Sequence, residues 1–293
     1  MAGGTGFVGS AVVKELIDNG INVLGLARSK SSAGKLISWG AQPIYGSLTD
    51  LEVLSKAAAQ SDATIHLGFN NDFHHFIKSG KVDQEAIQTM GQAIEGTKKP
   101  LVITYGTTGI RNYTQTEHMV SNKGLSKLVS PRKSEIVARQ LINQGTNAFV
   151  VRLPPAVHGK GDRGFTKMMI DRAKEIHRAE YLGIGQHNWS AVHRLDAAHL
   201  FYLATMYGFE NPLTDERIFN AVGDESIAMA DIAGTIGKKL NVPLKLRYNP
   251  VSLGNTAFLN LMNCSASSTI TQRTLGWSPK QSGLLADISS SAY

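Results

Sequence analysis

Cysteine is almost absent from this chain of 293 residues, which contains only Cys264. A lone thiol cannot form a disulfide within the chain, so we expect a protein of a reducing compartment, with the cytoplasm as the default location. No apolar run is long enough to span a membrane, and no segment resembles a signal peptide. These absences give no reason to expect a membrane partner.

Charged residues are moderate in number, at 18% of the chain, and hydrophobic residues make up 42%, as in ordinary globular enzymes. The formal net charge of +7 raises nucleic acid as a partner. However, the basic residues are spread out, and adjacent lysines occur only as Lys98-Lys99 and Lys238-Lys239. Neither a zinc-ligand spacing nor an aromatic RNA-binding motif accompanies them. We therefore expect no nucleic-acid partner and a basic surface that favours anionic cofactors.

Glycines are placed at regular intervals near the start of the chain, at Gly3, Gly6 and Gly9. This spacing suits a dinucleotide pyrophosphate, because one glycine makes a tight turn, one lets the phosphate approach bare backbone, and one lets a helix pack closely on a sheet. Phe7 and Val8 would open that helix, whose amide groups and dipole attract an anion. The segment is therefore predicted to bind a dinucleotide.

The hydrophobic strand that normally precedes such a loop is missing, as after a mis-set start site or a truncation. The strand would be central and buried on both faces. Its loss would remove about five or six apolar side chains, each worth ~1.5–3 kcal/mol on burial. The sum, on the order of 10 kcal/mol, is comparable to the ~5–15 kcal/mol that stabilises a domain. We therefore expect poor stability, and unpaired edges on two strands, unless another segment fills the slot.

Short apolar runs alternate with helical periodicity over the first half of the chain. Helices are predicted at 8–17, 32–39, 51–59, 82–95 and 133–144, and strands at 21–27, 43–45, 63–67, 101–104 and 148–153. Residues 106–130 have no clean period and are predicted to be a loop. The alternation predicts an α/β fold, a Rossmann-type doubly wound parallel sheet whose first strand is missing.

The pattern loosens after residue 157. Helices are predicted at 165–176, 197–207 and 228–240 and strands at 218–222 and 244–246, with a loop leading to His193. We therefore divide the chain into an NAD(P)-binding domain at 1–157 and a smaller substrate-side region at 158–293, of which about 190–207 packs back on the first. Phe165 and Trp189 could wall an apolar substrate pocket, and core packing explains them equally well.

The residues after the strand predicted at 21–27, which is the second strand of the fold when the missing first strand is counted, indicate which coenzyme is bound. An acidic residue there binds ribose hydroxyls, whereas an arginine accommodates a 2′-phosphate. This chain has Arg28-Ser29-Lys30, so NADP(H) is favoured, with NAD(H) as a second option. The alternative is a surface arginine that begins a helix.

Several segments together resemble an extended, atypical short-chain dehydrogenase/reductase of the NAD(P)-dependent epimerase/dehydratase family. They are GGTGFVGSAVVKELIDNG, Gly46-Ser47-Leu48-Thr49-Asp50, His66-Leu67-Gly68-Phe69, Arg152-Leu153-Pro154-Pro155-Ala156-Val157-His158-Gly159, Val192-His193-Arg194-Leu195-Asp196-Ala197-Ala198 and Leu275-Gly276-Trp277-Ser278-Pro279. The resemblance implies that Leu48 lies by the adenine, Gly68 and Phe69 by the ribose and pyrophosphate, and Pro154-Pro155 near the nicotinamide. Ser47 replaces the family's usual acidic residue.

The family's catalytic Tyr-x-x-x-Lys motif is missing, since no tyrosine of this chain has lysine four residues later. Lys127 and Pro131 fill those positions. Thr107 is then a candidate hydroxyl donor to a substrate oxygen. Candidate proton donors are Tyr105, His193 and His158, each of which could instead have only a packing role.

His74-His75 next to Asp72 could suggest a metal site. No third ligand follows at metal spacing, so we expect a loop and no metal.

These observations predict an NADP(H)-dependent oxidoreductase that reduces a small aldehyde or ketone. A catalytically silent NAD(P)-binding sensor or partner protein is the alternative from another class. A nucleotide-sugar epimerase or dehydratase is a third reading, less favoured because its chemistry needs the missing Tyr and Lys. The family resemblance also raises a homodimer as one assembly.

Overall fold

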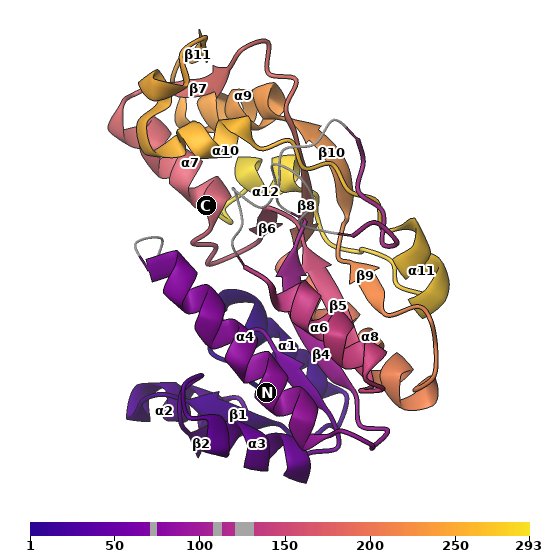
Figure 1. Ribbon diagram of the computed structural model, residues 1–293. Coiled ribbons are helices and arrows are strands. Elements are labelled where there is room, and N and C mark those ends of the chain that lie inside the picture. The colour runs from indigo at the N-terminus through magenta and orange to yellow at the C-terminus, as the bar shows by residue number, and fades with distance from the viewer. Residues whose placement is uncertain (71–74, 108–112, 121–131) are drawn as a thin grey trace.

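A computed structural model describes residues 1–70, 75–107, 113–120 and 132–293 (Figure 1). It has a parallel sheet with helices on both faces and a second lobe built from the C-terminal segments. The alternating helices and strands thus form the α/β architecture predicted from the sequence.

The main sheet contains two groups of parallel strands. The first pairs β1 (Leu24–Ala27) with β2 (Gln42–Tyr45), and the second has the order β3-β4-β5-β9, formed by Thr64–His66, Leu101–Gly106, Ala148–Leu153 and Ile218–Asn220. Both faces are covered, which explains why β4 and β5 are almost entirely apolar and buried.

Met1 and Ala2 join the two groups. The amide of Leu26 donates to the carbonyl oxygen of Met1 at 2.9 Å, and the amide of Ala2 donates to that of Ile65 at 2.9 Å. Met1 and Ala2 therefore occupy the position of the central strand, between β1 and β3. The connections run outward in opposite directions from it, which makes this point the topological switch where ligands of such sheets bind.

Helices cover each face of the sheet with a separate apolar cluster. On one face, α1 (Phe7–Asp18), α2 (Lys30–Ser38) and α8 (Arg194–Glu210) pack through Val12, Leu36 and Phe201. On the other, α3 (Leu51–Gln60), α4 (Phe76–Ala93) and α6 (Ser134–Asn143) pack through Leu54, Ile87 and Leu141. This arrangement holds the carboxyl ends of the strands along one edge.

The C-terminal lobe has its own core. Its strands are β6 (Ala156–His158), β8 (Asn188–His193) and β10 (Asp224–Ala228) in one sheet, and β7 (Ala179–Leu182) with β11 (Leu244–Arg247) in another. Its helices are α7 (Phe165–Glu175), α9 (Met229–Leu240), the 3₁₀ helix η2 (Pro250–Thr256), α10 (Ala257–Leu261) and α12 (Leu284–Ser289). A further helix, α11 (Thr269–Leu275), lies beside β9.

Several predicted elements need correction. The loop predicted to lead up to His193 is wrong, because it contains β7 and most of β8, whose strand partners lie far away in the sequence. The strand predicted at 21–27 begins at Leu24, since the amide of Ile21 instead bonds the Leu16 carbonyl at the end of α1. The helix predicted at 82–95 begins earlier, at Phe76.

The proposed boundary at 157/158 remains a prediction. α8 packs against α1, and β9, also from the second half, pairs with β5. No helix within the described ranges is both long and apolar enough to cross a membrane.

Candidate active site

The glycine loop before α1 leaves no room for side chains. Gly3 has φ +83°, and a Cβ there would lie 2.6 Å from the backbone nitrogen of Gly68. A Cβ on Gly9 would lie 2.0 Å from the carbonyl oxygen of Gly3. Gly6 is the N-cap residue of α1, so Phe7 and Val8 present the first amides of that helix. Bare backbone at a helix N-terminus fits a pyrophosphate.

Arg28 and Ser29 follow β1 at the same edge of the sheet. Arg28 is exposed and has no ion-pair partner among the described residues. Ser29 caps α2, with its hydroxyl accepting a hydrogen bond from the amide of Ser32 at 3.2 Å. Ser29 thus has a structural role, whereas the Arg28 guanidinium is available for a phosphate.

Leu48, Gly68 and Phe69 come together near the end of β3. A Cβ on Gly68 would lie 3.2 Å from a methyl carbon of Leu48. The Phe69 ring contacts Phe76 edge to face, with 5.4 Å between the centroids. The residues assigned to adenine and ribose by resemblance are therefore neighbours.

Thr107 links the ends of β4 and β5. Its amide donates to the carbonyl oxygen of Leu153 at 2.9 Å, directly before Pro154-Pro155, which are buried. Its buried hydroxyl lies 3.5 Å from that of Ser190. Tyr105, on β4 itself, points into the cluster under α6, where its hydroxyl donates to the carbonyl oxygen of Arg132 at 3.3 Å.

His193 and His158 form a separate group at the ends of β8 and β6. Their rings are 5.5 Å apart, and both face Asp287 of α12, at 2.7 Å from His158 Nδ1 and 3.8 Å from His193 Nε2. Burial lowers the pKa of His193, and a charge on His158 would lower it further. Ser190, the neighbour of Thr107, precedes His193 by three strand positions, about 10 Å. The structure groups His193 with His158 rather than with Thr107.

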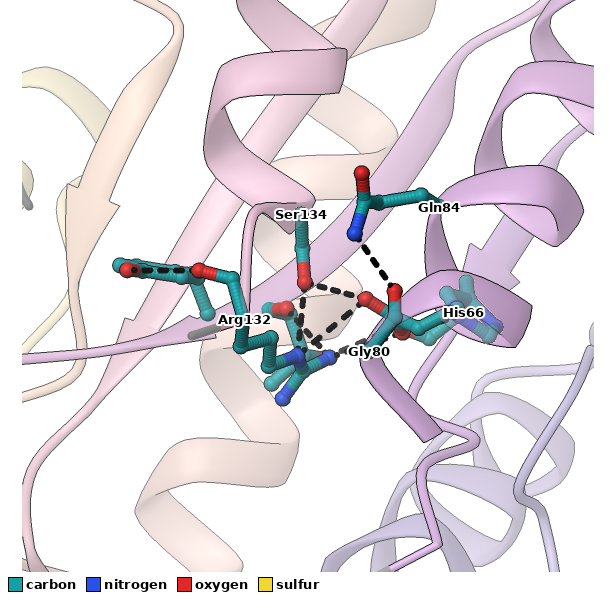
Figure 2. Close-up of polar contacts among 8 residues, drawn as sticks. His66, Gly80, Gln84, Arg132 and Ser134 are labelled. Atoms are coloured by element: carbon teal, nitrogen blue, oxygen red, sulfur yellow. Dashed lines mark hydrogen bonds and ion pairs between the residues drawn. The ribbon is translucent and has the colours of Figure 1, made fainter. Parts of the chain in front are cut away.

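A buried polar network that was not predicted from the sequence lies between β3, α4 and the start of α6 (Figure 2). Asp83 accepts from Arg132 at 3.1 and 3.3 Å and from Ser134, and it contacts His66 Nε2 at 3.0 Å. Burial alone would raise the pKa of Asp83, yet Arg132, His66 and Ser134 together lower it to about 2. The network joins three separate segments, at His66, at Asp83 and at Arg132 with Ser134, so no single local motif identifies it.

A second buried ion pair supports the end of β5. Arg152 is fully buried and donates to both carboxylate oxygens of Glu135, at 2.7 and 2.8 Å. It also donates to the carbonyl oxygens of Thr116, Glu117 and Met119. The family segment contains Arg152, but its partner could not be read from the sequence.

Some residues named in the sequence analysis lie in the protein core or outside the residues that the structure describes. Trp189 is fully buried in the second core, 6.2 Å from Phe165, as core packing requires. Lys127, Pro131, Asp72 and His74 lie outside the described residues. Within the described ranges, no group of three or more His, Cys, Asp or Glu side chains is placed to hold a metal ion.

A glycine loop that opens a helix at the switch point of a parallel sheet is the arrangement of a dinucleotide-binding protein. Residues 3–179 match the NAD(P)H-binding family, to which the chain belongs. An uncharacterized protein of Schizosaccharomyces pombe is 36% identical over 297 residues, covering all of this chain and 98% of the relative. One of Saccharomyces cerevisiae is 38% identical, covering 98% and 96%.

Solved structures share the whole fold. A dTDP-glucose 4,6-dehydratase from Streptomyces venezuelae, solved with NAD and TYD bound, has a TM-score of 0.72 at 16% identity, covering 96% of this chain and 91% of that chain. The fold is therefore that of the extended short-chain dehydrogenases/reductases, as the sequence segments indicated.

Proposed function

We propose that this protein is an NADP(H)-dependent oxidoreductase that reduces a small aldehyde or ketone by hydride transfer. The observation that carries the proposal is the glycine loop at the switch point, where a Cβ on Gly9 would collide with Gly3. Arg28 and Thr107 lie at ends of strands in the same sheet. Arg28 would bind the phosphate of an anionic coenzyme, and Thr107 would place a hydroxyl beside the reacting group.

Residues along this edge would hold the coenzyme, whose nicotinamide ring supplies a hydride when bound. The glycine loop and the amides of Phe7 and Val8 bind the pyrophosphate. Arg28 binds the 2′-phosphate, which selects NADPH over NADH. By resemblance, Leu48 and Gly68 contact the adenine and ribose, and Pro154-Pro155 border the nicotinamide.

Thr107 has the catalytic role of donating a hydrogen bond to the carbonyl oxygen, which stabilises the negative charge that develops on it. Tyr105 and His193 remain alternative proton donors. Tyr105 lies on β4, two residues before Thr107. His193 stands apart from Thr107, and its lowered pKa favours the neutral imidazole at neutral pH. We therefore favour Tyr105.

The test begins with titration of NADPH and NADH, followed by thermal shift and nicotinamide fluorescence. Tighter binding of NADPH, lost in Arg28→Gln without a loss of NADH binding, supports the coenzyme assignment. A panel of small aldehydes and ketones then measures turnover. Thr107→Val and Tyr105→Phe should each lower kcat by about tenfold or more. Thr107→Ser, which keeps the hydroxyl, is the matched control.

A silent NAD(P)-binding sensor is the second candidate, favoured by the missing Tyr-x-x-x-Lys motif. It predicts coenzyme binding with no turnover in the panel. Equal kcat in wild type, Thr107→Val and Tyr105→Phe would overturn the catalytic assignment while leaving coenzyme binding intact.

A further inference from the structure

Arg194, the first residue of α8, reaches across to the start of α1. Its Nη2 donates to the hydroxyl of Ser10 at 2.8 Å, and its guanidinium carbon lies 4.7 Å from the centre of the Phe7 ring. Its Nη1 donates to the carbonyl oxygen of Lys160 at 3.1 Å. Phe7 is the first residue of α1, so Arg194 lies beside the helix end that carries the glycine loop.

This guanidinium is only partly satisfied. Of the five N–H groups of an arginine, two make the contacts above. Nε is buried and has no hydrogen-bond partner among the described residues. Burial also lowers the pKa of Arg194. The Arg194 side chain therefore keeps N–H donors for which the described residues supply no acceptor, and it is partly removed from water.

No carboxylate of the described chain lies within ion-pair distance of Arg194. Arg132 and Arg152 differ from it, because Arg132 is paired with Asp83 and Arg152 with Glu135. A half-buried cation without a counter-charge is costly, and here it stands beside the positive end of a helix dipole. Both charges favour an anion that binds between them.

We propose that Arg194 is a coenzyme-binding residue that contacts the pyrophosphate of the dinucleotide. The inference rests on the proposed function, since that function supplies the anion. Arg194 would act on a group that NADH and NADPH share, whereas Arg28 would act on the 2′-phosphate of NADPH alone. Arg194 would therefore contribute to the affinity for both coenzymes, and Arg28 to the selectivity for NADPH over NADH.

The test compares Arg194→Gln with Arg217→Gln. Arg217 is a matched control because it is also half-buried, lies over an aromatic ring (Phe149, 5.1 Å) and bonds carbonyl oxygens, among them that of Pro212. Calorimetry would measure the Kd of NADH, NADPH, ADP-ribose and adenosine 2′-monophosphate, which lacks the pyrophosphate. Circular dichroism would confirm that each variant is folded.

Arg194→Gln should weaken NADH, NADPH and ADP-ribose by about tenfold or more, as expected for a lost charge-assisted hydrogen bond. It should leave adenosine 2′-monophosphate unchanged, and Arg194→Lys should restore part of the loss. Wild-type affinity for ADP-ribose should also fall more steeply with salt than that of Arg194→Gln.

Unchanged NADH and ADP-ribose affinity in folded Arg194→Gln overturns the inference but leaves the proposed function standing. An equal loss for adenosine 2′-monophosphate, or for Arg217→Gln, also overturns it, because the effect would then be structural. A wild-type protein that binds no dinucleotide overturns both proposals.

Discussion

The guanidinium carbon of Arg132 lies 4.3 Å from the centre of the Phe69 ring. The same guanidinium donates to both carboxylate oxygens of Asp83, so one side chain joins a predicted coenzyme contact to the buried network of Figure 2. A cation over an aromatic face contributes favourably when it is partly desolvated. The packing of α4 and α6 therefore helps to hold Phe69, a predicted coenzyme contact, in position.

Removing the Arg132 charge should destabilise the fold. Arg132→Met leaves Asp83 buried without its cation, which typically costs about 3 kcal/mol or more. Urea unfolding measures the loss. In Asp83→Asn/Arg132→Met, the two single losses should fail to add by about 1 kcal/mol or more. Additive losses would show that the two side chains are not coupled.

The stability that Asp83 contributes should depend on pH. Its folded pKa of about 2 lies below the usual 3.8, so the folded protein holds the ionised form more strongly than the unfolded chain does. The contribution, roughly 2–3 kcal/mol, is present above pH 4 and lost as the pH falls toward 2. Urea unfolding of wild type and Asp83→Asn from pH 7 to pH 2 should show a difference that shrinks in this window. A constant difference would contradict the assignment.

A methyl group on Gly9 should disrupt the glycine loop. Gly9→Ala places a Cβ 2.0 Å from the carbonyl oxygen of Gly3, and forced repacking of this kind typically costs about 1–3 kcal/mol. NADPH binding should be lost as well. Gly34→Ala, at an open helical position of α2, is the control and should stabilise by about 0.5–1 kcal/mol. Thermal unfolding with and without NADPH separates the loss of stability from the loss of coenzyme binding. NADPH binding retained by Gly9→Ala would contradict the loop assignment.

The Glu135–Arg152 pair should matter far more than a surface pair. Glu135→Gln leaves a fully buried guanidinium without its counter-charge, with an expected loss of about 3 kcal/mol or more. Glu52→Gln, which breaks an exposed pair with Lys56, should change stability far less than Glu135→Gln does. Chemical denaturation of both variants checks this, and equal losses would be inconsistent with the burial of Arg152.

The main sheet could be predicted well because its signals are local. The apolar runs of β4 and β5 and the glycine loop are visible in adjacent residues. β8 was missed because its partners, β6 and β10, come from distant segments that supply its hydrogen bonds. Its sequence alone, with polar Asn188 and Ser190, is also compatible with a loop.

The residues of the candidate site also differ in whether a local sequence signal or only the packing indicates their position. Thr107 and the glycine loop were predicted as site elements because Thr107 follows a recognisable strand and the loop precedes a helix. His193 was grouped with Thr107 by reasoning from motifs, whereas the structure places it beside His158 and Asp287. Arg194 lies within a family segment, but only the packing of α8 on α1 brings it to Phe7.

The sequence by itself determined the alternation of helices and strands, the glycine loop and the class of coenzyme. These follow from side-chain periodicity and backbone freedom within a few neighbouring residues. Only the tertiary structure decided which charges pair. Arg132 and Asp83 are 49 residues apart, and His158 and Asp287 are 129 apart. Such partners meet only when helices and strands pack, because burial then forces each polar group to find a partner.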